Sequence, residues 1–239
     1  MYIKTTHSTN TLLKELIAKG EEPKFIYAGY QTAGRGQTGN SWESEEGKNL
    51  LCSVLLPPRK NLFELNVAVS VAVRRVVGED FTIKWPNDIY WQDKKVAGIL
   101  IENAIIGNEV KYSIAGIGLN VNQTDFVSDA PNPISMKQIY GTDFAVDELM
   151  EKLYAEVQRA LDEDVWAEYK AHLYRREGFW RFVERPVSIE PTMNASSQEP
   201  IADSFMARIK DILPTGEIVL QDQEGKERKY HFKQIRYVV

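Results

Sequence analysis

The residues best suited to chemistry lie in one glycine-rich stretch, Gln31-Thr32-Ala33-Gly34-Arg35-Gly36-Gln37-Thr38-Gly39-Asn40-Ser41-Trp42. Its glycines let the backbone reach positive φ and approach a ligand closely, while Arg35, the amides and the indole of Trp42 are available to bind that ligand. These residue types predict a loop that closes over an anion. The same composition also occurs in glycine-rich surface turns, so the stretch alone does not decide the function.

Two apolar runs flank this loop and predict strands, Lys24–Tyr30 before it and Asn49–Leu56 after it. A loop between two strands does not open a helix. It therefore fits neither a Walker A loop nor a Rossmann phosphate site, and the pattern GxxxxGK[ST] is absent from the chain.

Length and composition describe an ordinary globular protein. The chain has 239 residues, 43% hydrophobic and 26% charged, which suffices for one sizeable core and a small second unit. Lys plus Arg against Asp plus Glu gives 29 − 34 = −5, which argues against a protein whose main partner is a nucleic acid. A single cysteine, Cys52, excludes an internal disulfide and a cysteine-based zinc site, and its apolar strand predicts an inert core thiol.

No apolar run in the sequence approaches the length of a membrane span, and Met1–His7 lacks the hydrophobic region of a signal peptide. We therefore expect a cytoplasmic protein without a membrane partner.

Periodicity predicts the helices and a sheet. The expected helices are Thr5–Gly20, Leu62–Val77, Asp143–Glu163 and Val165–Arg176. Strands separated by tight turns, an antiparallel meander, are expected at Phe81–Trp85, Ile89–Trp91, Val96–Glu102 and Val110–Val121. Ser8, Thr9 and Asn10 at the start of the first helix serve either as N-caps or as donors and acceptors for a small polar ligand.

Gly116 and Gly118 interrupt the last of these strands, just before Asn120 and Asn122. Glycine inside a strand marks a bulge or a place where another group approaches the backbone. We favour the close approach.

The sequence pattern changes from about Gly178, where helical periodicity gives way to short predicted strands. Short strands are expected at Arg185–Ile189, Ala207–Ile212, Glu217–Leu220 and Lys229–Phe232, and a mobile loop at Pro191–Pro200. Such strands predict a small β-barrel appended to an α+β body. We therefore expect a large domain over residues 1–177 and a small domain over residues 178–239.

Four stretches, taken in this order, closely resemble the biotin protein ligase family: Gln31–Trp42, Lys84–Asp88, Lys95–Glu102 and Gly116–Asn122, with Ser8-Thr9-Asn10 upstream. The resemblance implies a mixed, mainly antiparallel sheet with flanking helices, the class II synthetase-like biotin/lipoate ligase fold, and an SH3-like C-terminal barrel. Because residues 1–177 carry no winged-helix segment before the catalytic motifs, we expect the monofunctional type, without a DNA-binding domain.

The resemblance also implies a two-step reaction. The carboxylate of biotin attacks the α-phosphate of ATP to give biotinyl-5'-AMP, and a lysine of a biotin carboxyl carrier domain then takes the biotin. ATP and biotin are the implied substrates and Mg²⁺ the implied cofactor. The sequence leaves the oligomeric state open, a homodimer included.

The implied site residues fall into three groups. Lys95 and Arg35 match the catalytic cations. The biotin-binding positions are Ser8, Thr9, Asn10, Gln31, Gly34, Arg35, Gly36, Gln37, Lys95, Gly98 and Gly116. The nucleotide-binding positions are Arg35, Gln37, Asn40, Trp42, Lys84, Asn87, Lys95 and Asn120. The sequence shows no dedicated metal cage, and Asp88 is the nearest candidate ligand.

The chain departs from the family at Gln37 and Asn40, where several members carry arginines that would hold the intermediate. Other interpretations of the residues stay open: Lys95 as an exposed turn lysine, and Lys84 and Trp85 as ordinary strand alternation. For the whole chain, the alternatives are a lipoate ligase of the same fold and a non-catalytic biotin-binding module.

Overall fold

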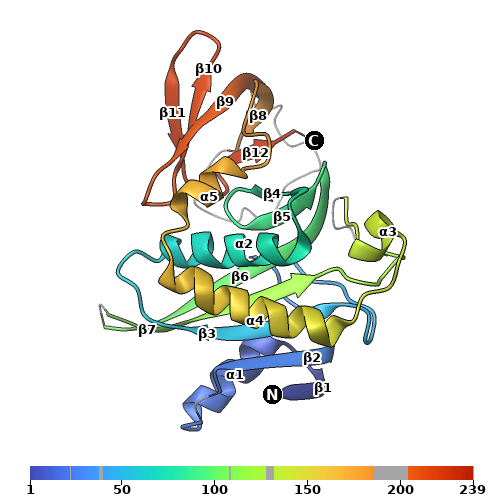
Figure 1. The fold of residues 1–239 in the computed structure, drawn as a ribbon. Coiled ribbons are helices and arrows are strands. Elements are labelled where there is room, and N and C mark those ends of the chain that lie inside the picture. Colours follow the sequence, from blue (N-terminus) through green and yellow to red (C-terminus); the bar gives the residue numbers. More distant parts are fainter. Residues whose placement is uncertain (22, 38–39, 108, 128–131, 186–203, 239) are drawn as a thin grey trace, which may run out of the picture. The chain divides into compact units, whose positions relative to one another are not determined.

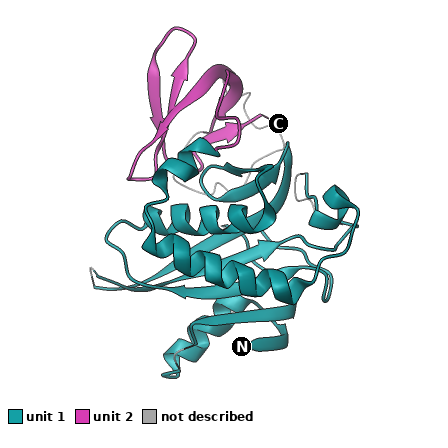
Figure 2. Cartoon of the chain, in the orientation of Figure 1, with its two compact units in different colours: residues 1–172 teal, residues 173–239 magenta. Residues whose placement is uncertain are grey.

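The computed structural model describes residues 1–21, 23–37, 40–107, 109–127, 132–185 and 204–238. The chain forms two compact units, Met1–His172 and Leu173–Val239 (Figure 2). The expected division at residues 177 and 178 falls just after this boundary. The expected loop at Pro191–Pro200 lies outside the described residues.

Within the described part of unit 1, seven strands form one sheet in the order β1-β2-β3-β7-β6-β5-β4 (Figure 1). The strands are β1 (Tyr2–Thr6), β2 (Phe25–Gln31), β3 (Leu50–Leu56), β4 (Phe81–Lys84), β5 (Asp88–Trp91), β6 (Lys94–Ile106) and β7 (Glu109–Leu119). Strands β4 to β7 pair antiparallel in sequence order, which confirms the predicted meander. Strand β7 then pairs antiparallel with β3.

Helices cover the sheet. They are α1 (Thr9–Ala18), α2 (Phe63–Val77), α3 (Met136–Tyr140), α4 (Val146–Asp162) and α5 (Trp166–Ala171). Helices α2 and α4 lie side by side on the sheet (Figure 1). The leucine side of α1 packs through Leu13 against Ile26 of β2 and Ile114 of β7. No helix among the described residues is long and apolar enough to cross a bilayer.

The core of unit 1 is apolar and contains the single cysteine. Cys52 in β3 is buried and free, as expected, and burial raises the pKa of its thiol. A buried thiol with a raised pKa is a poor nucleophile, so Cys52 has a packing role.

Two helix predictions are wrong at their ends. The first helix begins at Thr9, because Tyr2–Thr6 forms β1, which pairs parallel with β2. A parallel partner about 25 residues away leaves no local turn signal. The helix predicted over Val165–Arg176 ends at Ala171, and Arg175 has a φ of 57°, which a helix cannot contain.

In unit 2, the described residues form a five-stranded antiparallel sheet in the order β11-β10-β9-β8-β12. The strands are β8 (Trp180–Glu184), β9 (Ser204–Ile212), β10 (Ile218–Asp222), β11 (Glu227–Tyr230) and β12 (Ile235–Tyr237). This sheet is consistent with the expected SH3-like barrel. Strands β8 and β12 were not predicted. Of the strand predicted over Arg185–Ile189, all but Arg185 lies outside the described residues.

Candidate active site

The centre of the candidate site is a glycine-lined floor on β6 and β7. In their register Gly98 lies opposite Gly118, and Leu100 lies opposite Gly116. Directly paired residues of antiparallel strands project from the same face of a sheet, as do residues two apart. These positions therefore share one face with Ile114, on which α1 packs. Without side chains at Gly98, Gly116 and Gly118, other side chains can approach the backbone of this face closely.

The start of α1 stands against this floor. Ser8 is the N-cap, with extended backbone but no capping bond from its side chain. The backbone N–H and the hydroxyl of Thr9 instead donate to Gln31 Oε1, at 2.8 and 3.1 Å. Ser8, Thr9 and Asn10 are all at least nine-tenths buried. Capping by Ser8 is thus wrong for its side chain, and Gln31 supplies the acceptor.

Asn10 and Ser53 extend this polar group. The Ser53 hydroxyl lies 2.7 Å from Thr9 Oγ1 and donates to Asn10 Oδ1 at 2.6 Å. A Cβ added at Gly116 would lie 2.5 Å from Asn10 Oδ1. The group that approaches Gly116 is therefore the Asn10 amide. Sequence reasoning missed Ser53, whose only local signal was a hydroxyl inside an apolar strand.

The glycine-rich loop forms a narrow hairpin over its described residues. Trp42 N donates to Gly34 O at 3.0 Å and Gly36 N to Asn40 O at 2.8 Å. A Cβ added at Gly34 would lie 2.5 Å from the carbonyl oxygen of Trp42. Gly34 and Gly36 do not have positive φ. The expected positive φ is therefore wrong at these two positions, where glycine serves close chain approach, and Gly39 lies outside the described residues.

The hairpin places the Trp42 indole on the glycine floor. A Cβ at Gly118 would lie 2.3 Å from Trp42 Cε2, and one at Gly98 would lie 2.9 Å from Trp42 Cζ3. Trp42 Nε1 is buried and has no hydrogen-bond partner in the described part of the chain. The close approach expected at these strand glycines is thus made by an indole whose N–H can still donate to a ligand.

Lys95 lies at one end of the floor. Its Nζ lies 2.8 Å from Asp88 Oδ1 and 5.8 Å from the centre of the Trp42 ring. A Cβ added at Gly98 would lie 3.2 Å from Lys95 Nζ. The side chain of Lys95 is 27% exposed. It is therefore folded over the floor and is not the solvated turn lysine of the alternative interpretation.

Arg35 points to a carboxylate that sequence reasoning did not assign. Its Nη2 lies 3.0 Å from Glu102 Oε2 and 3.3 Å from Thr11 Oγ1. Burial raises the pKa of Glu102, but its hydrogen bonds with Lys14 and Asn10 and the charges of Lys14 and Arg35 outweigh burial, so this pKa lies below the ordinary value of 4.5. The alternation Gly98, Leu100, Glu102 on one strand face could have identified this residue.

The nucleotide-side residues divide into two places. Gln37 Nε2 donates to Asn87 Oδ1 at 3.0 Å, and the buried Asn87 donates to Asn66 Oδ1 at 2.9 Å. Lys84 lies opposite Asp88 in the register of β4 and β5, and its Nζ donates to Tyr90 OH at 2.9 Å. Both places adjoin the segment Lys84–Asp88.

The other two predicted nucleotide-side residues are Asn120 and Asn40. Asn120 is buried, and its Nδ2 donates to the carbonyl oxygen of Ile134 at 3.2 Å, so its amide holds the chain before α3. Asn40 is exposed, and its side chain lies beside Gly36. The structure thus does not bring Asn120 or Asn40 into a bond with Lys95 or Arg35.

Among the described residues, no group of three or more His, Cys, Asp or Glu side chains could hold a metal ion. Asp88, the nearest candidate ligand, is engaged by Lys95. A cation near these residues would therefore depend mostly on oxygens supplied by a ligand and by water.

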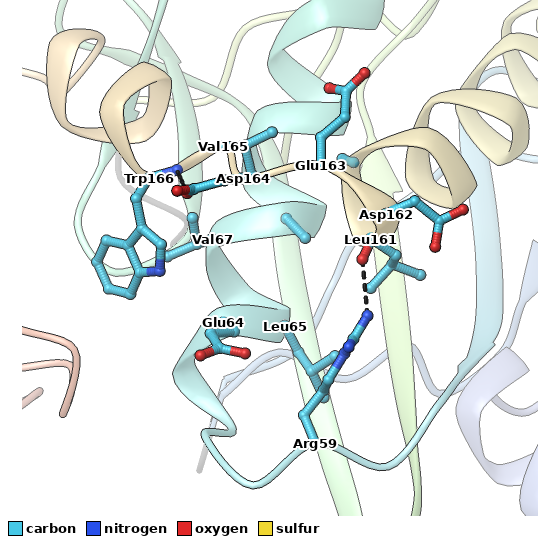
Figure 3. A pocket seen from close by; sticks show the side chains of 12 residues that line it. Arg59, Glu64, Leu65, Val67, Leu161, Asp162, Glu163, Asp164, Val165 and Trp166 are labelled. Atoms are coloured by element: carbon cyan, nitrogen blue, oxygen red, sulfur yellow. Dashed lines mark hydrogen bonds between the residues drawn. The ribbon is translucent and has the colours of Figure 1, made fainter.

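A separate cavity of about 420 Å³ lies between the start of α2 and the connection from α4 to α5 (Figure 3). Arg59 Nη2 donates there to the carbonyl oxygen of Leu161 at 2.7 Å. None of the predicted site residues lines this cavity. The chemistry-bearing residues gather on the glycine floor instead.

The chain is similar in sequence to known proteins. Residues 2–120 match the model of the biotin/lipoate A/B protein ligase family. The bifunctional ligase/repressor BirA of Escherichia coli is 27% identical over 191 residues, which is 76% of this chain and 59% of that protein. The biotin--[acetyl-CoA-carboxylase] ligase of Paracoccus denitrificans is 31% identical over 125 residues, 48% of this chain and 52% of that protein. The chain thus spans little more than half the length of these relatives.

The solved structures extend the likeness to both units. Biotin protein ligase from Aquifex aeolicus, in complex with biotin and ATP, superposes with a TM-score of 0.77 and 22% identity and covers 100% of this chain. A biotin protein ligase from Leishmania major with biotinyl-5-AMP has a TM-score of 0.63 and 19% identity, and covers 96% of this chain. The predicted fold class, an α+β ligase fold with a small C-terminal β-unit, is confirmed.

Proposed function

Because the chain belongs to the biotin/lipoate A/B protein ligase family, we propose that it activates biotin with ATP and transfers the biotin to a lysine of a biotin carboxyl carrier domain. The observation that carries this proposal is the placement of Asn10 and Lys95 on one glycine floor, against Gly116 and Gly98 respectively. A polar group for a ring and a cation for a carboxylate are what biotin requires.

In the first step, an oxygen of the biotin carboxylate bonds to the α-phosphorus of ATP. The bond from that phosphorus to the bridging oxygen breaks, and pyrophosphate leaves with the electron pair. Two anions have to meet, and fixed cations offset their repulsion. Lys95 is the catalytic residue we assign between them, because a point-charge ammonium follows an anion whose geometry changes during attack.

Arg35 is the second cation of the proposal. A planar guanidinium can bind a carboxylate or a phosphate with two parallel hydrogen bonds. Lys84 and Asn87 belong to the segment that would face the nucleotide phosphates, and Gln37 donates to Asn87. Asn120 would line the nucleotide side through the backbone that it holds in place, since its amide is bonded to Ile134 O.

In the second step, the amine of the carrier lysine attacks the acyl carbon of biotinyl-5'-AMP. An amide forms, AMP leaves with the electron pair, and the amine loses a proton. Water would destroy the mixed anhydride before the carrier arrives. The Trp42 indole, at the end of the hairpin, lies over the floor and is suited to exclude that water.

Magnesium is part of the proposal as a companion of ATP. It would neutralise phosphate charge when bound. With no carboxylate cluster among the described residues, the donors that fit it are phosphate oxygens and water, and Asp88 is the nearest carboxylate of the chain.

We place the reaction in the cytoplasm, because the only cysteine is a buried free thiol, as is usual in reducing compartments. The partner of the second step would be the carrier domain of a biotin-dependent carboxylase. A homodimer is a further part of the proposal, since β1 leaves one edge of the sheet unpaired among the described strands. Light scattering would decide its stoichiometry.

The test is incubation with biotin, ATP, magnesium and a carrier domain, followed by mass measurement of the carrier. We expect a mass increase of one biotinyl group that depends on all three small molecules. Biotin binding without pyrophosphate release would instead identify a non-catalytic binding module.

Lipoate is the rival substrate, because the matched family includes lipoate ligases. The polar group of Thr9, Asn10 and Gln31 favours the ureido ring of biotin over the dithiolane ring of lipoate, which offers no N–H groups. In a thermal-shift titration, stabilisation by lipoate alone would overturn the assignment.

A further inference from the structure

Glu102 contacts both Asn10, which we assign to the ring of biotin, and Arg35, which we assign to its carboxylate. It lies in β6 opposite Ile114, on the face that also carries Gly98 and Leu100. Its side chain is 20% exposed. Three donors from two other elements reach its carboxylate, and they are Lys14 Nζ at 2.6 Å, Asn10 Nδ2 at 2.7 Å and Arg35 Nη2 at 3.0 Å.

The contact with Asn10 determines which end of that amide faces a ligand. A carboxylate only accepts, so the group directed at Glu102 is the NH₂ of Asn10. The same NH₂ donates to Leu100 O at 3.4 Å, which uses its second hydrogen. The oxygen accepts from Ser53 and keeps one lone pair. Asn10 can therefore offer a ligand only an acceptor, which suits an N–H of a ureido ring.

The contact with Arg35 has a different consequence. Both bonds of its guanidinium to described side chains, Glu102 and Thr11, come from Nη2. Within the described chain, Nε and Nη1 make no such bond. One corner of the planar fork is thus fixed, while the remaining donors can bind an anion.

The charges support the same arrangement. One carboxylate faces two cations, so Lys14, Arg35 and Glu102 together keep a positive excess. An ionised carboxylate that accepts several hydrogen bonds orients each donor more firmly than a neutral acceptor does. Glu102 can therefore fix its partners without cancelling the positive charge that a biotin carboxylate needs.

We propose that Glu102 is a positioning residue for biotin, which fixes Asn10 as an acceptor for the ureido ring and fixes Arg35 as a donor to the carboxylate. This inference rests on the proposed function and adds a residue that would not touch the substrate. It makes recognition of the ring and of the carboxylate depend on one side chain.

The first test measures biotin affinity by calorimetry in the full chain. Glu102→Gln keeps the shape but turns an NH₂ toward donors, so we expect binding to weaken by about tenfold or more. The matched control is Glu109→Gln, at the far end of the same β6–β7 hairpin, where Glu109 pairs only with the exposed Lys111 among the described residues. It should bind biotin within about twofold of wild type. Equal affinities of the Glu102→Gln and control variants would overturn the inference.

The second test separates positioning from general damage. Biotinol, which has an alcohol in place of the carboxylate, reports the ring alone. In the otherwise wild-type chain, Glu102→Gln should lower the affinity for biotinol by about tenfold. In an Asn10→Ala background the same substitution should lower that affinity by less than about twofold, because Glu102 acts on the ring through Asn10. The same loss in both backgrounds would mean a merely structural role. Glu102→Gln should also reduce the ratio of the affinities for biotin and biotinol, because that ratio measures recognition of the carboxylate by Arg35.

Circular dichroism checks that each variant folds. If Glu102→Gln does not fold, Glu102→Asp decides, because it keeps the charge but withdraws the carboxylate from Asn10 and should weaken biotin binding by about threefold or more. Affinity of a folded Glu102→Asp variant equal to wild type would overturn the inference. If the wild-type protein bound no biotin, the proposed function would be overturned. If the wild-type protein and Glu102→Gln bound biotin with equal affinity, only the role of Glu102 would be overturned.

Discussion

The ammonium of Lys95 lies 2.8 Å from the carboxylate of Asp88, and both side chains are partly exposed. The pair joins the start of β6 to the start of β5, beside the Trp42 indole. An ion pair of this exposure contributes little to stability, so its value lies in holding the ammonium over the glycine floor. An incoming carboxylate and phosphate would compete with Asp88 for the same cation.

Lys95→Ala is expected to reduce biotin-dependent pyrophosphate release by about a hundred- to a thousandfold, because it removes the charge between two anionic reactants. The melting temperature should change little, because the ion pair of Lys95 with Asp88 is partly exposed and contributes little to stability. Lys94→Ala is the matched control, one residue away and exposed, and it should release pyrophosphate at the wild-type rate. Near-normal turnover of Lys95→Ala would remove Lys95 from the proposed role.

Gln37→Arg is expected to slow the escape of biotinyl-5'-AMP by about threefold to tenfold. Gln37 donates to Asn87 Oδ1 at 3.0 Å, and an arginine can keep that donor while adding a positive charge for the phosphate. Gln37→Glu is the matched opposite, because it removes the donor and adds a negative charge, and escape should become faster. Trapping the released intermediate with hydroxylamine measures both rates. Unchanged release in both variants would contradict the role of the loop in retention.

The parts of the fold that follow from local pattern were predictable. The meander of β4 to β7 has short turns and alternating strands, and α2 and α4 have long apolar faces. Gly116 and Gly118 were also identified locally, because glycine weakens a strand and is found there mainly at bulges and close backbone approaches, whereas Gly98 was assigned through the family resemblance. For Gly98 and Gly118, however, the identity of the approaching group, Trp42, depends on how the loop folds back.

The residues that sequence reasoning missed are brought in by long-range register. Asn10 and Glu102 are 92 positions apart in the chain, and Ser53 meets Asn10 across 43 positions. The local pattern shows which strand face each residue occupies, but at these separations it does not show which residue it will contact. Ser53 faces Asn10 because it pairs with Gly116 in the sheet, which only the register of β3 and β7 determines. Strand β1 was missed for the same reason, since its parallel partner is not its neighbour in a hairpin.

Gly118→Ala is expected to destabilise the chain by about 1 to 3 kcal/mol, because its methyl group would lie 2.3 Å from Trp42 Cε2 and would force the indole off the floor. The same substitution in a Trp42→Ala background should cost less than about half as much, since the clash is gone. Urea unfolding of the four proteins in this cycle measures both costs. Equal costs in the two backgrounds would show that the indole does not lie on Gly118 in solution.

Acid should weaken the attachment of α5 to α2. Hydrogen bonds from Arg75, opposed by burial, lower the pKa of Glu168 from its ordinary value of 4.5. A carboxylate whose pKa is depressed in the folded state stabilises the fold above the unfolded-state pKa, and that contribution is lost as pH falls through the folded-state pKa. We therefore expect the free energy of unfolding to fall as the pH drops below about 4.5.

Glu168→Gln tests this dependence. Near neutral pH it should lower the free energy of unfolding by about 1 to 3 kcal/mol, because Arg75 and the buried Arg74 lose a charged acceptor. It should also flatten the loss of stability below pH ~4.5, since the titrating group has been removed. Glu15→Gln, at an exposed position of α1, is the control and should keep the wild-type profile. Parallel profiles for Glu168→Gln and wild type would mean that Glu168 does not carry the acid sensitivity of unit 1.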